Sequence, residues 1–504
     1  MYKTIKFKKS DVATENYDVD TIMQNAFDAF EKYKKIPPAR RAYFLEKIAG
    51  EIEKLKPRLV SIANEESNLP LVRLNGELTR TTNQLKMFAS LLNEGSWVDA
   101  SIDSGNPHVM PVKPDIRKML VPVGPVVVFG ASNFPFAFST AGGDTASALA
   151  SGSVVIVKAH SAHAVTSELV FKAIENAIEL MGMPAYTVQH VIGSGNTVGK
   201  ALVMHPHAKG VGFTGSFSGG KALVEYSNQR DIPIPVFAEM SSINPVVFYP
   251  DTLSKNAKAL AATYAASITL GAGQFCTNPG ILIGMKSEAF DHFLNALATE
   301  VIKVIPQKML HSGIYDTYNN GLQQILDQEG VGVVARSSSE AGEMEAVATI
   351  VSINAKKFLS DRRFSEEIFG PYSLAVICDD KVELIKTLRS LKGQLTTTVM
   401  GTDNDIHEYA DVIEIQHSLA GRIILNNAPT GVEVCASMVH GGPYPATTDA
   451  RFTSVGTTAI KRWVRPVCFQ NFTEAMLPDE LKNNNPSGIL RLVDNTYTRE
   501  GIMS

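Results

Sequence analysis

The sequence predicts an α/β protein built around a parallel, doubly wound sheet. Between residues 123 and 248, short apolar runs typical of buried strands alternate with helical segments, and glycine-rich turns follow two of the runs, at 193–195 and 214–220. Strands that alternate with helices along a chain pair in parallel. Because 504 residues exceed what one hydrophobic core usually supports, two or three lobes are expected.

The elements expected in chain order begin with helices. Apolar residues recur at spacings of three and four from residue 20 to about residue 63, and residues 87–98 continue this pattern. Residues 101–113 are polar and proline-containing, which indicates a linker, a turn or an edge ribbon. A helix is expected over 166–181. Six strands are expected over 123–130, 153–157, 187–192, 210–213, 236–238 and 245–248, the last completing the set.

A second α/β unit is expected over residues 252–440, and the tail from Val464 onward could pair with another subunit. Residues 119–143 and 259–285 lack charge over lengths that raise the question of a membrane span. Both contain Gly, Asn, Ser and Pro at many positions, which suits a buried α/β core. Residues 1–10 are polar and lysine-rich, so no secretory signal is expected there. The protein is therefore expected to be cytoplasmic, without a membrane partner.

Charge and cysteine usage exclude several classes of site. The formal charge is 47 − 51 = −4 and no long basic run occurs, so no nucleic-acid partner is expected. The four cysteines are far apart and form no CxxC pair, which argues against a structural zinc site and against a disulfide framework. No metal is expected.

The segment Gly-Ala-Gly-Gln-Phe-Cys-Thr that contains Cys276 is the sharpest candidate for chemistry. Its glycines let the backbone approach a ligand closely. Taken alone, a cysteine is more often a small buried hydrophobe than a nucleophile. The residues that accompany Cys276 along the chain favour the catalytic interpretation.

Two further polar residues follow apolar, strand-like runs. Glu239 ends the run 235–240 and would be costly to bury as an anion, so it suits a general base, or else a structural salt bridge. Asn133 follows the run 123–130 and could donate a hydrogen bond to an oxyanion, although a turn-capping asparagine is the commoner case.

Lys158 and the glycine-rich turns point to a cofactor. Lys158 ends the strand over 153–157, and open α/β sheets bind ligands at the carboxyl ends of their strands. The turns that contain Gly195 and Gly215 could each open a helix N-terminus toward a phosphate. A solvated lysine and ordinary turns are the alternatives.

Together these segments resemble the aldehyde dehydrogenase superfamily over about residues 20–490. Six motifs stand in the family's order: SNFP, the strand ending in Lys158, FTGS, AEM, GQFC and EEIFGP. The resemblance implies a Rossmann-type cofactor domain over 1–100 and 122–245 and an α/β catalytic domain over 246–442. It also implies a small oligomerisation element over 101–121 and 460–490, in a homodimer or homotetramer.

Carried over residue by residue, the resemblance implies an NAD(P)-dependent oxidation of an aldehyde to an acid through a thioester. Cys276 is the nucleophile, Asn133 and the Cys276 N–H form the oxyanion hole, and Glu239 is the general base. The implied cofactor contacts are Lys158 at the adenosine ribose, Gly195, Gly215 and Ser216 by the pyrophosphate, and Glu367 and Phe369 by the nicotinamide ribose.

Local sequences such as SNFPFAFSTAGGDTASALASG and TGVEVCASMVHGGPYPATTD resemble the branch with 2,5-dioxovalerate (α-ketoglutarate semialdehyde) dehydrogenases. This implies oxidation of the small aldehyde 2,5-dioxopentanoate to 2-oxoglutarate. Fatty-aldehyde dehydrogenases lie close to that branch and are the first alternative. Two further alternatives are a CoA-acylating enzyme and a non-catalytic protein that retains the fold. Glu239 argues against a CoA-acylating enzyme, because a general base serves hydrolysis. The joint presence of Cys276, Glu239, Asn133 and Lys158 argues against a non-catalytic protein.

The cofactor preference and the substrate pocket follow from the same resemblance. Many NAD-preferring relatives carry Glu where this chain has Ser161, after His160; a neutral residue would not repel a 2′-phosphate, so NADP is expected, with NAD also used. The expected pocket residues are Phe134, Phe138, Phe275 and His440. Arg451 is a candidate for binding a substrate carboxylate, with a surface arginine as the alternative.

Overall fold

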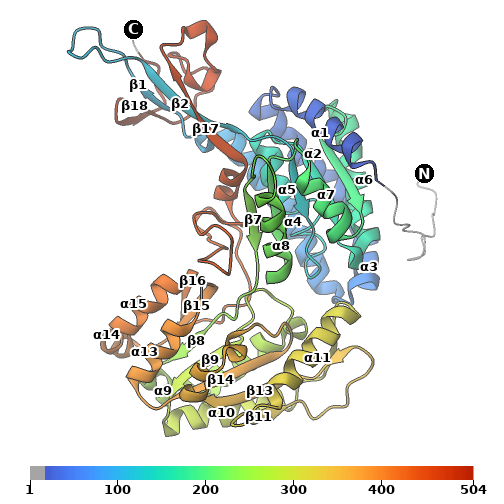
Figure 1. The fold of residues 1–504 in the computed structure, drawn as a ribbon, viewed down its shortest axis with the longest axis vertical. Coiled ribbons are helices and arrows are strands. Elements are labelled where there is room, and N and C mark those ends of the chain that lie inside the picture. The colour runs from blue at the N-terminus through green and yellow to red at the C-terminus, as the bar shows by residue number, and fades with distance from the viewer. Residues whose placement is uncertain (1–16, 503–504) are drawn as a thin grey trace.

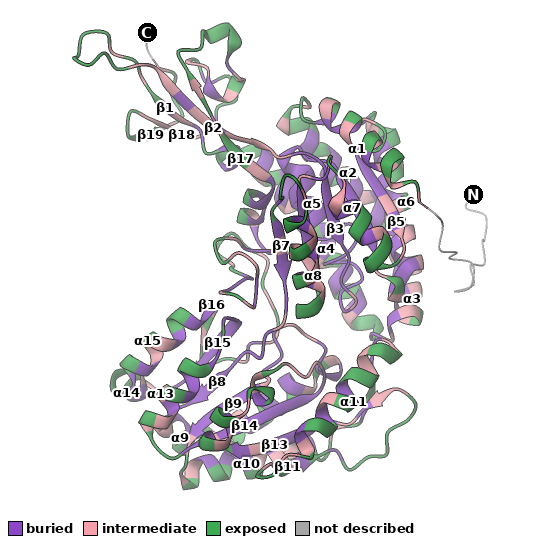
Figure 2. Ribbon diagram, viewed as in Figure 1, coloured by how far each residue is buried: buried purple, intermediate pink, exposed green. Residues whose placement is uncertain are grey.

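The computed structural model describes residues 17–502. Two lobes, each built on a mainly parallel sheet, lie one below the other, and a further five-stranded sheet projects from the upper lobe (Figure 1). The inner strands of the two parallel sheets are largely buried, while the edge strands Gly332–Arg336 and Ala420–Leu425, the projecting sheet and the outer helix faces are partly or fully exposed (Figure 2).

The first lobe contains a five-stranded sheet in the order β5-β4-β3-β6-β7, parallel throughout. Its strands are β3 (Val126–Phe129), β4 (Val155–Ala159), β5 (Val188–Ile192), β6 (Gly210–Thr214) and β7 (Val236–Glu239). Its connecting helices are α5 (Gly143–Ser151), α6 (Ala164–Met181), α7 (Lys200–Met204) and α8 (Phe217–Asn228). The predicted parallel sheet is confirmed, since each of these five strands overlaps a predicted run.

Four amphipathic helices at the start of the described chain complete this lobe. They are α1 (Val19–Tyr33), α2 (Pro38–Lys54), α3 (Lys56–Ser67) and α4 (Leu71–Glu94). The helical pattern predicted for 20–63 is thus divided among three helices, and the one predicted over 87–98 begins much earlier, at Leu71. Their buried faces join the core of the sheet.

The second lobe contains a seven-stranded sheet in the order β11-β13-β14-β9-β8-β15-β16, parallel except at β11. Its strands are β8 (Val246–Phe248), β9 (Ile281–Met285), β11 (Gly332–Arg336), β13 (Thr349–Asn354), β14 (Tyr372–Cys378), β15 (Gln394–Met400) and β16 (Ala420–Leu425). Its longer helices are α9 (Pro250–Thr269), α10 (Glu288–Val301), α11 (Ser312–Leu326), α13 (Lys381–Ser390) and α15 (Ala410–Leu419). The prediction that 245–248 completes the first set of strands was wrong, because β8 is an inner strand of this second sheet.

The projecting sheet has the order β17-β2-β1-β18-β19. Its strands are β1 (Ser101–Asp103), β2 (Ile116–Pro122), β17 (Val464–Gln470), β18 (Arg491–Val493) and β19 (Thr496–Thr498). β17 pairs antiparallel with β2 along its whole length and forms one edge of the sheet. Residues 101–113, predicted to be a linker, a turn or an edge ribbon, comprise β1 and most of the loop between β1 and β2.

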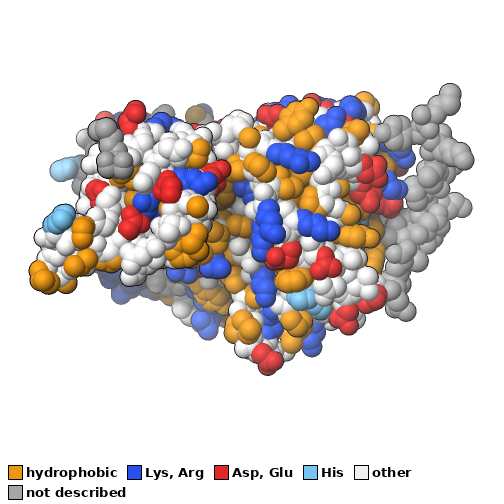
Figure 3. All heavy atoms as spheres, turned by 90° about the horizontal axis from the view of Figure 1, so that it is seen from above, with side chains coloured by type: hydrophobic (Ala, Val, Ile, Leu, Met, Phe, Trp, Pro, Cys, Tyr) orange, Lys and Arg blue, Asp and Glu red, His pale blue; other side chains and the backbone are white. Residues whose placement is uncertain are grey.

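No helix among the described residues is long and apolar enough to cross a membrane. The uncharged stretches 119–143 and 259–285 contain β3, β9, parts of β2 and α9, and the loops beside them. The face shown in Figure 3 carries acidic and basic side chains intermingled with apolar ones.

Candidate active site

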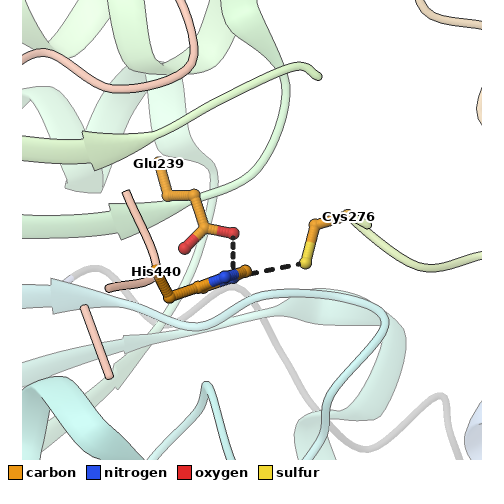
Figure 4. A group of neighbouring side chains, drawn as sticks. All are labelled: Glu239, Cys276 and His440. Carbon is orange, nitrogen blue, oxygen red and sulfur yellow. Dashed lines mark hydrogen bonds and ion pairs between the residues drawn. The ribbon is translucent and has the colours of Figure 1, made fainter. Parts of the chain in front are cut away.

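Three side chains from distant segments meet at the junction of the two lobes (Figure 4). Sγ of Cys276 lies 3.4 Å from Nε2 of His440. The same Nε2 lies 2.9 Å from Oε1 of Glu239. The Ser454 hydroxyl donates to the other carboxylate oxygen, Oε2, at 2.9 Å. The structure thus brings a thiol, an imidazole and a buried carboxylate together.

A strained turn presents Cys276. After α9 the backbone takes left-handed conformations at Gly271 (φ 55°), Ala272 (φ 55°) and Gly273 (φ 66°). A Cβ on Gly273 would lie 2.2 Å from the carbonyl oxygen of Gly370, so only glycine fits there. Nδ2 of Asn244 donates to the Cys276 carbonyl at 2.9 Å, and this hydrogen bond holds the backbone of the turn in place. The thiol is therefore held on an ordered backbone.

Asn133 lies next to this turn, immediately beyond β3. Its Nδ2 donates to the carbonyl of Gln274 at 3.2 Å. Its own carbonyl accepts a hydrogen bond from Nη2 of Arg73 at 2.6 Å. Since an amide nitrogen carries two hydrogens, Nδ2 can donate a second bond toward a substrate oxygen.

The pKa values of the thiol and of the carboxylate are shifted in opposite directions in this site. Burial raises the pKa of Cys276 well above its ordinary value, and the nearby Glu239 raises it further. Burial also works to raise the pKa of Glu239, but the charge and hydrogen bond of His440, with help from Ser454, outweigh it and hold that pKa below its ordinary value. Glu239 is therefore ionised at neutral pH, while the Cys276 thiol keeps its proton in the free protein.

This arrangement predicts how the thiol reacts with iodoacetamide. Because only the thiolate reacts, inactivation of the free protein should accelerate about tenfold per pH unit from about pH 7 to about pH 9, without a plateau. Glu239→Gln removes the anion that raises the pKa of Cys276, so the variant should be alkylated faster at neutral pH. Mass spectrometry of the modified peptide gives the rate. A plateau near neutral pH in the unaltered protein would contradict the proposed electrostatics.

Three phenylalanines form an aromatic wall beside the thiol. The ring of Phe134 packs edge-on against Phe138 at 5.3 Å and against Phe275 at 5.8 Å. Phe138 lies 6.1 Å from the ring of His440. These residues, expected in the substrate pocket from sequence, do lie together.

Arg451 does not join them. Its side chain is 81% exposed and pairs with Asp449 through two hydrogen bonds, at 2.9 and 2.5 Å. The prediction that Arg451 meets a substrate carboxylate is not supported, because its guanidinium points to solvent and already has a carboxylate partner.

The structure supplies two other arginines that sequence reasoning missed. The guanidinium of Arg73 lies 5.0 Å from the centre of the Phe134 ring and 4.4 Å from that of Phe275. That of Arg80 lies 6.0 Å from Phe134 and 5.6 Å from Phe138. Both come from α4. The signal in the sequence was Arg73, Glu77 and Arg80 at spacings of four and three, which put them on one helix face.

The residues expected to bind a cofactor gather at the carboxyl edge of the first sheet. Lys158 is buried near the end of β4, and burial lowers its pKa. Gly195 is exposed and begins the short π-helix Gly195–Gly199 after β5. Ser216 is exposed after β6 and caps α8 by accepting from the Gly219 N–H at 3.2 Å. Gly215, one residue before Ser216, is exposed as well.

His160 and Ser161 follow β4 directly. Nδ1 of His160 accepts from the Ala162 N–H at 3.1 Å. Burial, with help from neighbouring His163 and Lys158, lowers the pKa of His160 to about 3, so the ring is neutral. Ser161 is exposed.

Glu367 and Phe369 line a small pocket that also includes Gly273 and Phe275, next to the thiol's turn. Burial raises the pKa of Glu367 to about 7, against hydrogen bonds from Ser241 and Ser242. The segment 366–369 and the turn that carries Cys276 thus line the same pocket.

Comparison with known proteins agrees with this geometry. The sequence pattern of the aldehyde dehydrogenase family matches residues 6–446. Alpha-ketoglutaric semialdehyde dehydrogenase 2 of Azospirillum brasilense is 46% identical over 478 residues, 95% of this chain and 91% of the relative. Alpha-ketoglutaric semialdehyde dehydrogenase of Acinetobacter baylyi is 45% identical over 484 residues, 96% of this chain and 92% of the relative.

Solved structures share the fold at lower identity. 3,6-Anhydro-L-galactose dehydrogenase in complex with NAP has a TM-score of 0.76 at 22% identity, covering 90% of this chain and 91% of the other. 1-Pyrroline-5-carboxylate dehydrogenase from Thermus with bound NAD has a TM-score of 0.75 at 19% identity, covering 90% of this chain and 85% of the other.

Proposed function

The chain belongs to the aldehyde dehydrogenase family, and we propose that it oxidises 2,5-dioxopentanoate to 2-oxoglutarate with NADP as the preferred acceptor. The observation that carries the proposal is the thiol of Cys276 within reach of a buried, ionised Glu239. The two relatives that are 45–46% identical over nearly their full length support the choice of aldehyde.

The first step joins Sγ of Cys276 to the aldehyde carbon, and the thiol proton leaves to solvent by way of the Glu239 carboxylate, which is ionised again before the second step. Nδ2 of Asn133 and the Cys276 N–H donate hydrogen bonds to the resulting oxyanion. The nicotinamide cofactor supplies the acceptor for the hydride. When the oxyanion collapses and the C–H bond breaks, a thioester is left on Cys276.

The second step returns the free thiol. Glu239 removes a proton from a water as that water attacks the thioester carbon, the C–S bond breaks, and the carboxylic acid leaves. Oε1 of Glu239 suits this task, because it faces the thiol's side of the cluster, where Nε2 of His440 at 2.9 Å is its close polar neighbour. Ser454 holds the other oxygen and so sets the carboxylate's orientation. His440 acts as a positioning residue between thiol and base.

A poised base favours water over a thiol as acyl acceptor, which argues against a CoA-acylating enzyme. The test is to mix purified protein with NADP and 2,5-dioxopentanoate without CoA, and to follow NADPH absorbance and 2-oxoglutarate. Activity that requires CoA, or that occurs only with long-chain aldehydes, would overturn the proposal in favour of those alternatives. No oxidation of any aldehyde would indicate a non-catalytic protein.

The residues at the edge of the first sheet fit a nicotinamide dinucleotide. Exposed backbone N–H groups at Gly195 and at the capped start of α8 suit the pyrophosphate. Lys158 supplies a cation near the adenosine ribose, and Glu367 supplies acceptors for ribose hydroxyls. We accordingly assign residues 1–100 and 122–245 to cofactor binding and 246–442 to catalysis.

Ser161 supports the preference for NADP, since no carboxylate stands there to repel a 2′-phosphate. Ser161→Glu should weaken NADP binding several-fold more than NAD binding, because a unit charge near the phosphate costs on the order of 1 kcal/mol or more. Dissociation constants measured by protein fluorescence give the comparison without turnover. The neutral Ser161→Gln variant controls for size; equal weakening of both cofactors by Glu would show that position 161 does not face the ribose phosphate.

We also propose that the projecting sheet joins copies of the chain in a homodimer or homotetramer. β17 is an exposed edge strand, and large apolar side chains nearby are exposed, Met110 by 94%. Light scattering that gives the mass of a single chain would contradict this.

A further inference from the structure

One face of α4 carries two arginines and a glutamate toward the aromatic wall. Arg73, Glu77 and Arg80 follow one another at four- and three-residue spacings. The two guanidiniums lie over the rings of Phe134, Phe138 and Phe275, at 4.4 to 6.0 Å from the ring centres. Because Phe275 precedes Cys276, these cations lie close to the thiol, and the charge of Arg80 works to lower the pKa of Cys276.

The hydrogen-bond capacity of these arginines is largely unused. Nη1 of Arg73 is buried and has no hydrogen-bond partner within the described chain, although its Nη2 donates to the Asn133 carbonyl. Nε and Nη2 of Arg80 are likewise buried and without a partner among the residues described. A buried donor on a charged group costs free energy when it has no hydrogen-bond partner. Such a donor is explained where a bound ligand accepts the missing hydrogen bond.

Glu77 does not use up this capacity. Its Oε1 accepts hydrogen bonds from the Phe136 and Ala137 N–H groups at 2.8 and 3.0 Å, so it holds the loop after Asn133. The charge of Glu77 acts on both guanidiniums, and the charges of Glu239 and Glu433 act on Arg80, yet none of these carboxylates takes up the unpaired donors. Arg422 is better paired: both of its terminal nitrogens donate to backbone carbonyls, of Gly431 and Pro429, and only its Nε lacks a partner among the described residues.

We propose that Arg73 and Arg80 together bind the carboxylate of an aldehyde-acid substrate and so determine specificity. The proposal rests on the proposed function, in which the substrate carries an aldehyde and a 2-oxo acid. Nε and Nη2 are the two donors with which an arginine grips a carboxylate side-on, and in Arg80 it is these two that lack partners. Both residues are half-buried, so a small rotation of each guanidinium brings its donors to a ligand along the aromatic wall.

The arrangement also accounts for a short substrate. Arg73 contacts Phe275 and the Asn133 carbonyl, so the carboxylate site adjoins the oxyanion site. A chain of a few carbons spans from the thiol to the guanidiniums, while a long apolar aldehyde would bring no partner for these cations. The aromatic rings supply walls, and the two arginines supply the charge.

The test compares Arg73→Gln, Arg80→Gln and the double variant with the unaltered enzyme on 2,5-dioxopentanoate and on pentanal. Each single change should lower kcat/KM for the acid about tenfold or more, mainly through KM, because a charge-assisted hydrogen bond is lost. Pentanal, which has no carboxylate, should change less than about threefold. Arg80→Lys, which keeps the charge but not the two-pronged geometry, should fall between. Arg451→Gln is the matched control, since it removes an exposed arginine with its own partner.

A binding measurement separates failure of this proposal from failure of the proposed function. Calorimetry with glutarate should show at least tenfold weaker binding to the double variant than to the unaltered or Arg451→Gln protein. If the unaltered enzyme ignores 2,5-dioxopentanoate but oxidises 4-oxobutanoate in an Arg73- and Arg80-dependent way, the arginine site stands and the proposed substrate is wrong. Equal losses on pentanal and the acid, or unchanged glutarate binding, would overturn the arginine site itself.

Discussion

Cys276→Ala should abolish oxidation of every aldehyde, lowering kcat by more than about 10⁴-fold. The thiol makes the bond that converts the aldehyde into a species able to lose hydride, and neither His440 nor Glu239, its partners in the cluster, is proposed to replace it. NADPH absorbance under saturating substrate measures the loss. The effect should fall on chemistry alone, because Cys276 lies beside the cofactor pocket and does not cap its turns.

Two controls accompany this variant. Cys468→Ala removes an exposed cysteine on β17 and should leave turnover unchanged. Titration of NADP against Cys276→Ala, followed by protein fluorescence, should give a dissociation constant close to that of the unaltered protein. Turnover of Cys276→Ala near the unaltered rate would rule out the thioester mechanism.

Glu239→Gln should uncouple the two halves of the reaction. Thioester formation should persist, since the loss of the neighbouring anion lowers the pKa of Cys276, whereas hydrolysis should slow by about 10²- to 10⁴-fold without a general base. Stopped-flow absorbance should show a burst of about one NADPH per active site followed by slow turnover. Acid quenching during the slow phase should trap the acyl group on Cys276.

Hydroxylamine provides the decisive control for that variant. It attacks thioesters without help from a base, so it should restore turnover to Glu239→Gln and accelerate the unaltered enzyme little. A variant with no burst and no response to hydroxylamine would show that Glu239 is needed before the thioester forms.

The elements of the first lobe were predictable because each strand is a short apolar run followed by a turn or a helix. β8 was assigned to the wrong sheet for a physical reason. Its residues, Val246–Phe248, look like any buried strand, and the chain crosses from one lobe to the other in the few residues after Glu239. Local patterning reports burial on both faces but not which strand lies alongside.

The chemical residues were predictable for a related reason. Cys276, Glu239 and Asn133 each stand at the end of a recognisable segment, and the carboxyl ends of parallel strands converge. The arginines were not, because α4 reaches the site only through tertiary packing. Nearness in sequence suggested Arg451, while nearness in space belongs to Arg73 and Arg80. The direct approach of His440 to both thiol and carboxylate likewise depends on how the segment 438–455 folds back.

The position of Arg73, Glu77 and Arg80 within a single helix has a consequence for directed evolution. The thiol and the base come from other segments, so a mutational library on this face of α4 changes what the wall recognises, provided that it keeps Glu77, which holds the loop after Asn133. Exchange of the two arginines for apolar residues should therefore be a short route to enzymes that accept uncharged aldehydes, and a shift of the arginines by one helical turn a route to aldehyde acids of another length. The same separation would let natural relatives diverge in substrate while they keep one chemistry.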